Sequence, residues 1–368
     1  MPKYKEVSDR RICGNCERIM KIEKKKIIIG VFTAVLIIVG VGIWWLCIEN
    51  AKTDSNSIIS EMTKERPDAV VTVGVWKDGD VEYHVYGENG TELPAELHTY
   101  AIGSITKTFT GSLIAKEVSE GKLDVDQGIG AYVSLSNGAP SPSIKSLMTH
   151  TSGLTDQWEQ ALEEDMDVSF SREEMLALLE KQQLSDNNEP YYSNFGSALA
   201  GTTAAAVENL SYEEAMNRFV REELQLEHTK VGGSGDFGNN WNWKSGDEMM
   251  ADGAITSNVT DMLTYGRMHL ENKPFYLGLC HQPLAAFSED YDCGYFWLID
   301  KENGIIWHNG EVCTEDENGN LTGYQAFLGF APEKNCVAVV LSNMISYDKD
   351  ENAYTDLLGY ALLLQDTD

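Results

Sequence analysis

A serine and a lysine three residues apart form the first group able to do chemistry. Ser104 and Lys107 stand in the segment TYAIGSITKTFTGSLIAKE, where we expect a helix over residues 104–120. Residues three apart share one face of a helix, so the Lys107 amine can approach the Ser104 hydroxyl. A hydroxyl becomes a useful nucleophile only when a neighbouring base takes its proton. The helix N-terminus adds backbone N–H groups that stabilise developing negative charge.

This S-x-x-K pattern is short, and chance produces it twice more in the chain. The other two pairs are Ser119 with Lys122 and Ser346 with Lys349. Ser119 falls at the end of a predicted helix, and Ser346 falls in a polar turn after a predicted strand. Only Ser104 is expected where a loop enters a helix, so it is the candidate nucleophile.

A tyrosine and an asparagine in the segment EPYYSNFGSALAG form the second candidate group, in a turn that leads into a predicted helix. Tyr192 can act as a general base only if its pKa falls well below 10, and a nearby lysine ammonium would lower it. Asn194 can exchange hydrogen bonds with Lys107 and with a substrate amide. Taken alone, such a turn is more often a helix cap than a site.

The third candidate group ends a predicted strand in the segment IIWHNGEV. The backbone of His308, Asn309 and Gly310 can line one side of a cleft. The N–H of Glu311 would then complete an oxyanion hole with the N–H of Ser104, and losing such a donor typically costs about 10²–10³ in rate. The alternative is an ordinary strand-end histidine with a satisfied hydrogen bond.

The elements that must position these groups lie at both ends of the chain. Alternating residues around a turn at 77–80 predict an early β-hairpin, and residues 293–342 contain three or more strands. Residues 124–270 between them are rich in helical patterns, and a last helix is expected over 353–364. We therefore predict an α+β domain in which one antiparallel sheet, formed by both chain ends and flanked by helices, carries an inserted helical subdomain.

An apolar segment precedes this domain. Residues 27–48 contain no charge and, as a helix, would span roughly 33 Å, enough to cross a bilayer core. Trp44 and Trp45 stand where an interfacial aromatic belt is expected. A cleaved signal peptide is the rival, but it would be shorter and end in small residues. Cys47 does not fit a lipoprotein signal, because bulky residues precede it.

The basic residues before this segment predict its direction. Residues 1–26 carry nine lysines and arginines against four acidic residues, which favours a cytoplasmic N-terminus. We expect a basic cytoplasmic tail over 1–26, one transmembrane helix over 27–48, a polar linker over 49–56 and a hydrolase domain over 57–368. The protein would then be a single-pass protein of the cell membrane with its catalytic domain outside.

Composition restricts the partners. The net charge of −30 argues against a nucleic-acid partner, which needs clustered basic residues. The seven histidines are scattered without the spacing of metal ligands, and no cofactor is implied. A C-x-x-C pair in the tail lacks the further ligands of a zinc site. The sequence leaves the state of the external cysteines open among three disulfide pairings (Cys280, Cys293, Cys313 and Cys336).

In their order and contexts, the three groups resemble the penicillin-binding protein and class C β-lactamase superfamily, which also includes DD-peptidases and esterases. Connecting phrases are similar as well: LMTHTSGL at 147–154, VENLSYEEAMNRFVREELQLEHT at 207–229 and NVTDMLTYGRM at 258–268. The triplet SDN at 185–187 spells a motif of another β-lactamase class, but it lies in a polar run without a helix entry. The resemblance covers roughly residues 60–365.

This resemblance implies a β-lactamase/transpeptidase-like fold and a role for each residue. Ser104 would be the acylated nucleophile, with Lys107 and Tyr192 as the proton-handling pair. Asn194 would contact the substrate, and residues 308–310 would correspond to the family's Lys-Thr-Gly strand. Which of Lys107 and Tyr192 is the general base stays open.

The chain departs from the family pattern in the third group. His308 stands where the family usually has lysine, and the link after Gly310, EVCTEDENGNLT, is long and acidic. Glu311 beside the pocket would repel a substrate carboxylate unless it turns away. With the net charge of the domain, this favours neutral or cationic substrates.

We therefore predict a membrane-anchored serine hydrolase that acts through a Ser104 acyl-enzyme on an amide, ester or lactam. Family and location suggest a small molecule or a cell-wall peptide as substrate. The alternative is a penicillin- or peptidoglycan-binding sensor module that is acylated but does not turn over. A catalytically inert scaffold is a third possibility, against which the intact Ser104, Lys107 and Tyr192 argue.

Overall fold

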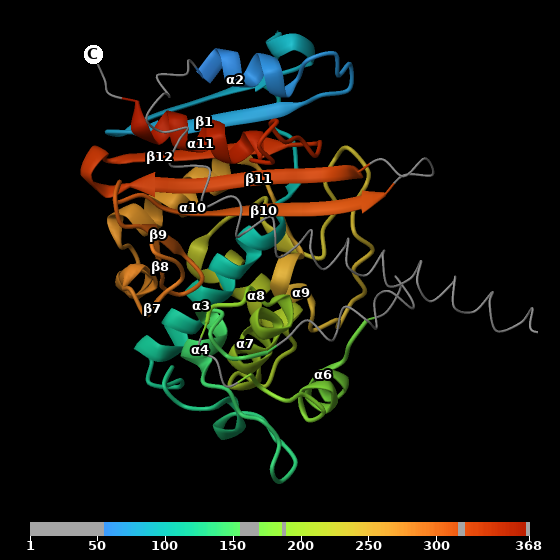
Figure 1. Ribbon diagram of the computed structural model, residues 1–368, viewed down its shortest axis with the longest axis vertical. Coiled ribbons are helices and arrows are strands. Elements are labelled where there is room, and N and C mark those ends of the chain that lie inside the picture. The colour runs from blue at the N-terminus through green and yellow to red at the C-terminus, as the bar shows by residue number, and fades with distance from the viewer. Residues whose placement is uncertain (1–54, 155–168, 186–188, 316–320, 366–368) are drawn as a thin grey trace, which may run out of the picture. The chain divides into compact units, whose positions relative to one another are not determined.

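The computed structural model describes residues 55–154, 169–185, 189–315 and 321–365 (Figure 1). Except for Lys349–Asn352, they belong to one compact unit. The predicted tail and transmembrane segment, and all but the last two residues of the predicted linker, lie outside these ranges. Within the ranges, every helix is too short or too polar to cross a membrane.

A nine-stranded antiparallel sheet joins the two ends of the described chain. Its order is β3-β2-β1-β12-β11-β10-β9-β8-β7. The strands are β1 (Val71–Lys77), β2 (Asp80–Tyr86), β3 (Glu92–Leu93), β7 (Ala285–Ala286), β8 (Tyr291–Cys293), β9 (Leu298–Asp300), β10 (Ile306–Glu315), β11 (Leu321–Ala331) and β12 (Cys336–Ser342). In Figure 1 the blue β1 lies beside the red β12, paired from Val71 with Ser342 to Lys77 with Cys336. The predicted α+β fold, with a sheet built from both chain ends, is confirmed.

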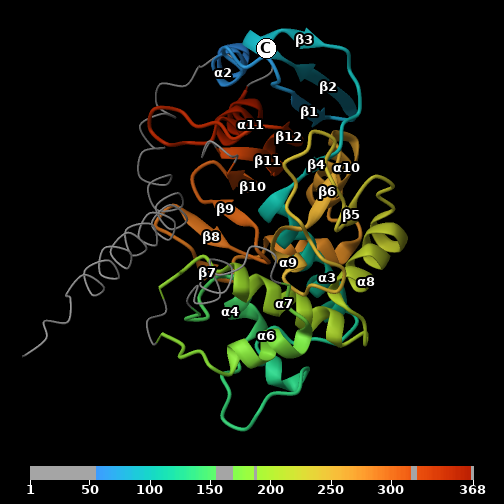
Figure 2. The same ribbon diagram turned by 90° about the vertical axis from the view of Figure 1, so that its right-hand side faces the viewer.

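Helices cover both faces of this sheet. On one face lie α2 (Ser55–Met62) and α11 (Tyr354–Leu364), and on the other lies α10 (Val259–Glu271), as Figure 2 shows. Successive side chains of β11 point to opposite faces of the sheet, and both faces carry apolar residues. Phe327 packs on Gly359 of α11, and Leu328 packs on Gly266 of α10. Both faces are therefore apolar, and all seven residues of β12 are buried.

The inserted region is helical, as predicted. It contains α3 (Thr106–Ser119), α4 (Ile144–Met148), α6 (Arg172–Leu179), α7 (Asn194–Ala206), α8 (Tyr212–Phe219) and α9 (Met250–Gly253). A small sheet of β4 (Tyr100–Ala101), β6 (Ile255–Ser257) and β5 (Lys230–Val231) lies beside α3. A capping box of Ser211 and Glu214 starts α8.

Helix α3 is the central helix of the domain. Its first ten residues, Thr106 to Ala115, are all buried, although five of them are polar or charged. Hydroxyl groups on this helix bond to its neighbours: Thr110 to Tyr212 (2.9 Å) and Ser112 to Tyr265 (2.8 Å). A buried hydroxyl needs such a partner, so these bonds hold α3 in one orientation within the core.

The external cysteines form no disulfides with one another. Cys280, Cys293 and Cys336 are buried and Cys313 is half-buried. The Cys293 thiol donates to the carbonyl of Met148 (3.5 Å). None of the three possible pairings is therefore formed.

Candidate active site

The loop that carries Ser104 packs directly on strand β10. Ser104 lies in a 3-10 turn (Gly103–Ile105) that continues into α3. Gly103 has φ +51°, and a Cβ there would lie 2.5 Å from the Glu311 nitrogen. On the opposite side, a Cβ on Gly310 would lie only 1.9 Å from the Ile102 carbonyl oxygen. Both positions therefore require glycine, because any side chain would separate the loop from the strand.

This packing places the backbone nitrogens of Ser104 and Glu311 at the same edge of strand β10. Strand β9 pairs with β10 only at Ile306 and Trp307, so the edge of β10 is open beyond that point. The nitrogen and the carbonyl oxygen of Glu311 both face Gly103, and the nitrogen of Ser104 faces Gly310. The backbone nitrogens of Ser104 and Glu311 thus lie where the loop meets the strand, and the oxyanion hole formed by their N–H groups stays a prediction.

Lys107 is completely buried and contacts the nucleophile directly. Its Nζ lies 2.8 Å from the Ser104 Oγ and donates to the carbonyl oxygen of Asp252 at 2.7 Å. Asp252 belongs to α9, which precedes β6, and the Ile255 N–H donates to the Thr106 hydroxyl at the start of α3 (3.1 Å). The predicted Ser104–Lys107 contact is therefore present, and α9 holds the lysine in place.

Tyr192 lies on the other side of Lys107, with its ring centroid 5.0 Å from Nζ. This is a cation–π distance, so the Lys107 side chain lies between the Tyr192 ring and the Ser104 hydroxyl as a direct neighbour of both. The His150 ring packs against Tyr192 at 4.4 Å, and its Nδ1 accepts from the Ser193 N–H (3.2 Å). Burial, with smaller effects of Lys107 and His308, holds the pKa of His150 well below its usual value, so the ring is neutral and can accept.

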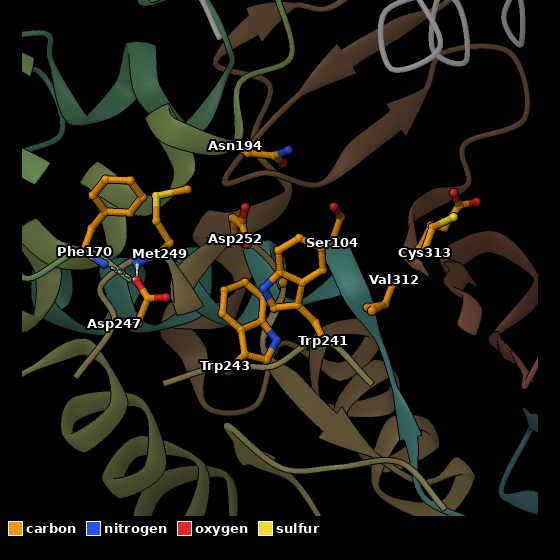
Figure 3. A pocket seen from close by; sticks show the side chains of 12 residues that line it. Ser104, Phe170, Asn194, Trp241, Trp243, Asp247, Met249, Asp252, Val312 and Cys313 are labelled. Atoms are coloured by element: carbon orange, nitrogen blue, oxygen red, sulfur yellow. Dashed lines mark hydrogen bonds between the residues drawn. The ribbon is translucent and has the colours of Figure 1, made fainter. Parts of the chain in front are cut away.

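Asn194 is the first residue of α7 and faces the cavity beside Ser104 (Figure 3). The Ser193 hydroxyl caps this helix by accepting from the Gly196 N–H (3.0 Å). The predicted hydrogen bond from Asn194 to Lys107 is wrong, because the described hydrogen bonds of Lys107 go to Ser104 and Asp252. The predicted contact of Asn194 with a substrate stays a prediction, and its place in the cavity wall is compatible with it.

His308 and Asn309 lie in β10, and both side chains are hydrogen-bonded within the chain. Burial is the main cause that lowers the pKa of His308 to about 4, so the ring is neutral where the family usually has an ammonium. The Asn309 amide donates to the buried Asp356 carboxyl (2.7 Å). This bond directs the amide toward α11, on the other side of the strand from Gly310, so a substrate contact through the backbone of Asn309 stays a prediction.

The Glu311 carboxylate is held at the edge of the cavity. It accepts from the Gln325 amide (2.9 Å) and from the Tyr347 hydroxyl. Burial and the Glu311 charge raise the pKa of Tyr347, which keeps that hydroxyl a donor. The predicted negative charge beside the pocket is therefore present, but hydrogen bonds from the sheet side restrain it.

A cavity of about 190 Å³ opens beside Ser104 (Figure 3). The cavity is lined mainly by the loop before α9, by α9 itself, by the start of α7 and by β10. The lining residues are Ser104, Phe170, Asn194, Trp241, Trp243, Asp247, Met249, Asp252, Gly253, Glu311, Val312 and Cys313. The wall thus combines aromatic rings with three carboxyl groups. Burial raises the pKa of Asp252 to about 7, partly opposed by Lys107 and reinforced by Asp247.

The sequence analysis missed several residues of this site. The carbonyl of Asp252, the His150 ring, and the rings of Trp241 and Trp243 belong to no short motif that we used. For His150 a signal existed, because it lies in the phrase LMTHTSGL that resembles the family. The contact of Asp252 with Lys107 joins residues 145 positions apart.

The competing motifs are placed elsewhere. The Ser119 hydroxyl donates to the Lys116 carbonyl (2.8 Å) at the exposed end of α3. The Ser346 hydroxyl is buried and faces the Met62 carbonyl (3.5 Å). The SDN triplet lies outside the described residues except for its serine.

One group of carboxylates in the described chain is close enough to hold a metal ion, formed by Glu117, Glu120 and Glu208. The Lys122 ammonium pairs with all three, so a cation of the chain already neutralises this group. None of these residues lines the cavity beside Ser104.

Comparison with known proteins agrees with this arrangement. Residues 56–361 match the family model described as Beta-lactamase. A β-lactamase of Providencia stuartii is 30% identical over 184 residues, which are 48% of this chain and 46% of that protein. The chain spans about half the length of the first two relatives that it matches.

Solved structures show the same fold. A class C β-lactamase from Rhodobacter sphaeroides superposes with a TM-score of 0.65 at 17% identity, covering 85% of this chain and 100% of that one. A D-stereospecific amidohydrolase from Streptomyces superposes with a TM-score of 0.64 at 18% identity, covering 84% and 97%. Because the family match extends over nearly the whole described domain, the chain belongs to the β-lactamase family of serine hydrolases.

Proposed function

We propose that this chain hydrolyses an amide, ester or lactam through an acyl-enzyme on Ser104. The observation that carries the proposal is the 2.8 Å contact between the Lys107 Nζ and the Ser104 Oγ, at the wall of a cavity and beside two converging backbone N–H groups. A nucleophile, a base and an oxyanion site are the parts that acyl transfer needs.

The reaction balances with these groups alone. A neutral Lys107 amine, or the Tyr192 phenolate beside it, takes the hydroxyl proton while Oγ bonds to the substrate carbonyl carbon. The bond to the leaving group breaks, and the leaving group receives that proton. A water molecule then loses a proton to the same base and attacks the acyl carbon; the bond from that carbon to Oγ breaks, and the base returns the proton to Oγ.

Carboxylate-bearing substrates are the less favoured class within this proposal. The Glu311 carboxylate borders the cavity, and the Asn309 amide, which could have bound an anion, is bonded to Asp356. Penicillins and cell-wall peptides ending in a free carboxylate would therefore react more slowly than neutral or cationic esters and amides.

The test uses the full chain in detergent with p-nitrophenyl propionate and, separately, a fluorescent penicillin. Ser104→Ala should abolish ester release and labelling, and Ser119→Ala, which changes the serine of a competing motif, should retain both. Release of many equivalents of product indicates a hydrolase, and one stable acyl adduct per chain indicates the sensor alternative. Equal behaviour of Ser104→Ala and wild type on both probes would refute the proposal.

The proposed enzyme is tethered to a membrane by residues 27–48, with residues 1–26 in the cytoplasm. The uncharged apolar segment, the two tryptophans near its end and the preceding basic residues support this arrangement. The full chain should stay with membranes after an alkaline carbonate wash, and a variant without residues 27–48 should not. External protease should reach residues 57–368. Release of the full chain by the wash would contradict the anchor.

A further inference from the structure

The carboxyl groups around the cavity differ in their partners. Asp247 accepts from the N–H groups of Phe170 (3.1 Å) and Met249 (3.0 Å), and Glu311 accepts from Gln325 and Tyr347. The Asp252 carboxyl makes no hydrogen bond or ion pair within the described part of the chain, although only 9% of the residue is exposed. The Lys107 charge partly offsets the burial of this carboxyl, but no donor of the described chain bonds to its oxygens, which are therefore available to a cation from outside the chain.

Asp252 also lies very close to the reacting atoms. Its backbone oxygen and the Ser104 Oγ contact the same Lys107 ammonium, at 2.7 and 2.8 Å. Lys107 contacts the backbone oxygen and leaves the carboxyl free. Figure 3 shows the Asp252 carboxyl and the Ser104 hydroxyl at the same cavity. A group bound by this carboxyl would therefore be only a few bonds from the substrate carbonyl.

Two indole rings border the same space. Trp241 and Trp243 lie 6.0 Å apart at 47° and are half-buried in the cavity wall. A Cβ on Gly253 would touch Trp243 on one side and the Gly103 backbone on the other, each at 3.9 Å. The rings thus lie next to the nucleophile loop. Tryptophan faces attract cations, and the effect is strongest where water is excluded.

From this geometry we infer that the cavity binds an acyl group carrying a protonated amine, with the Asp252 carboxylate as its ionic partner and the indoles of Trp241 and Trp243 beside it. The preferred substrates are then amides or esters of amino acids with a free amino group. The lining agrees, since it contains three carboxyl groups (Asp247, Asp252 and Glu311) and no lysine or arginine among the described residues. The inference rests on the proposed Ser104 hydrolase.

The test compares p-nitroanilides that differ only in the amine. The full chain in detergent is assayed at pH 7.5 with the D-alanyl, L-alanyl and β-alanyl compounds and with the propionyl compound, which lacks nitrogen in its acyl group. The best amino-acyl compound should exceed the propionyl compound at least tenfold in kcat/KM. In Asp252→Asn this ratio should fall to about one. The quantity compared between wild type and variant is this ratio of kcat/KM values, so a general loss of activity in the variant does not affect the comparison.

A second measurement covers an Asp252→Asn variant that is too slow to assay. Calorimetric titration with β-alaninamide should show binding to wild type at least tenfold tighter than to the variant, with propionamide as the neutral control. A wild-type enzyme that cleaves propionyl and amino-acyl compounds equally well would overturn the inference and leave the proposed function intact. So would an unchanged ratio in Asp252→Asn. Loss of all Ser104-dependent hydrolysis in wild type would overturn both.

Discussion

Replacing Gly310 with alanine should separate β10 from the loop that carries Ser104. The new Cβ would lie 1.9 Å from the Ile102 carbonyl oxygen and 2.9 Å from the Ser104 nitrogen. An ordinary contact begins at 3.4 Å, so the two backbones must move apart by about 1.5 Å. Both contacting groups are backbone, so rotation of a side chain cannot relieve the clash. The oxyanion site lies between these two segments.

The magnitude follows from this displacement. A shift of about 1 Å in a catalytic group can cost roughly 10²-fold in rate, and loss of one oxyanion donor costs about 10²–10³. We therefore expect Gly310→Ala to lower kcat/KM by about 10²–10³, equivalent to roughly 2.7–4 kcal/mol in the barrier. Overpacking should also reduce the free energy of unfolding by about 1–3 kcal/mol.

The assay is Ser104-dependent hydrolysis of p-nitrophenyl propionate, together with the melting temperature. Gly196→Ala is the matched control, because its Cβ would lie 3.4 Å from the Ser193 side chain, an ordinary contact. The control should retain nearly all of the activity. If Gly310→Ala folds and stays within fivefold of wild type, the close packing of β10 on the nucleophile loop is not what forms the oxyanion site.

Three further predictions concern the base, a buried carboxyl and a thiol. Lys107→Met should lower the rate of Ser104 acylation by about 10²–10⁴, and Tyr192→Phe should lower it by less, because Lys107 contacts Oγ directly. Stopped-flow measurements in which Tyr192→Phe acylates more slowly than Lys107→Met would contradict this. Burial raises the pKa of Asp356 from 3.8 to about 7, so the folded state holds its proton more tightly and loses stability as pH rises from about 4 to 7. Asp356→Asn should therefore raise the melting temperature more at pH 8 than at pH 4. An equal increase in melting temperature at both pH values would show that the buried Asp356 charge is not what destabilises the fold at high pH. Cys313 should react with maleimide before Cys280, whose pKa burial raises, and substrate should slow the labelling; peptide mapping that finds Cys280 labelled first would be inconsistent with this.

The parts of the site that depend on local geometry were predictable from the sequence. The three-residue spacing of Ser104 and Lys107 on a helix sets their contact. That conclusion needed only a few neighbouring residues. The strand end predicted at residues 308–310 was wrong, because β10 continues to Glu315 through its pairing with β11. The sheet of both chain ends was likewise predictable, because a hairpin at 77–80 and strands after 293 both needed partners.

The parts that depend on tertiary packing were not predictable. Whether Asn309 faces the cavity is decided by Asp356, which lies 47 residues later on α11. The role of Asp252 depends on α9 meeting α3, and no spacing in the sequence indicates that contact. Cysteine spacing likewise says nothing of burial, and Cys280 and Cys293 are both buried without forming a disulfide.

The pairing of β1 with β12 has a consequence for the order of events during synthesis. Val71 and Ser342 are neighbours in the sheet but are separated by 271 positions in the chain. At roughly 5–20 residues per second, β12 leaves the ribosome about 15–55 s after β1. During that interval the inner edge of β1 has unpaired backbone groups and can join a foreign strand. A chaperone that shields residues 71–77 until the last strand arrives should therefore raise the yield of active protein, whereas slowed translation without one should lower it.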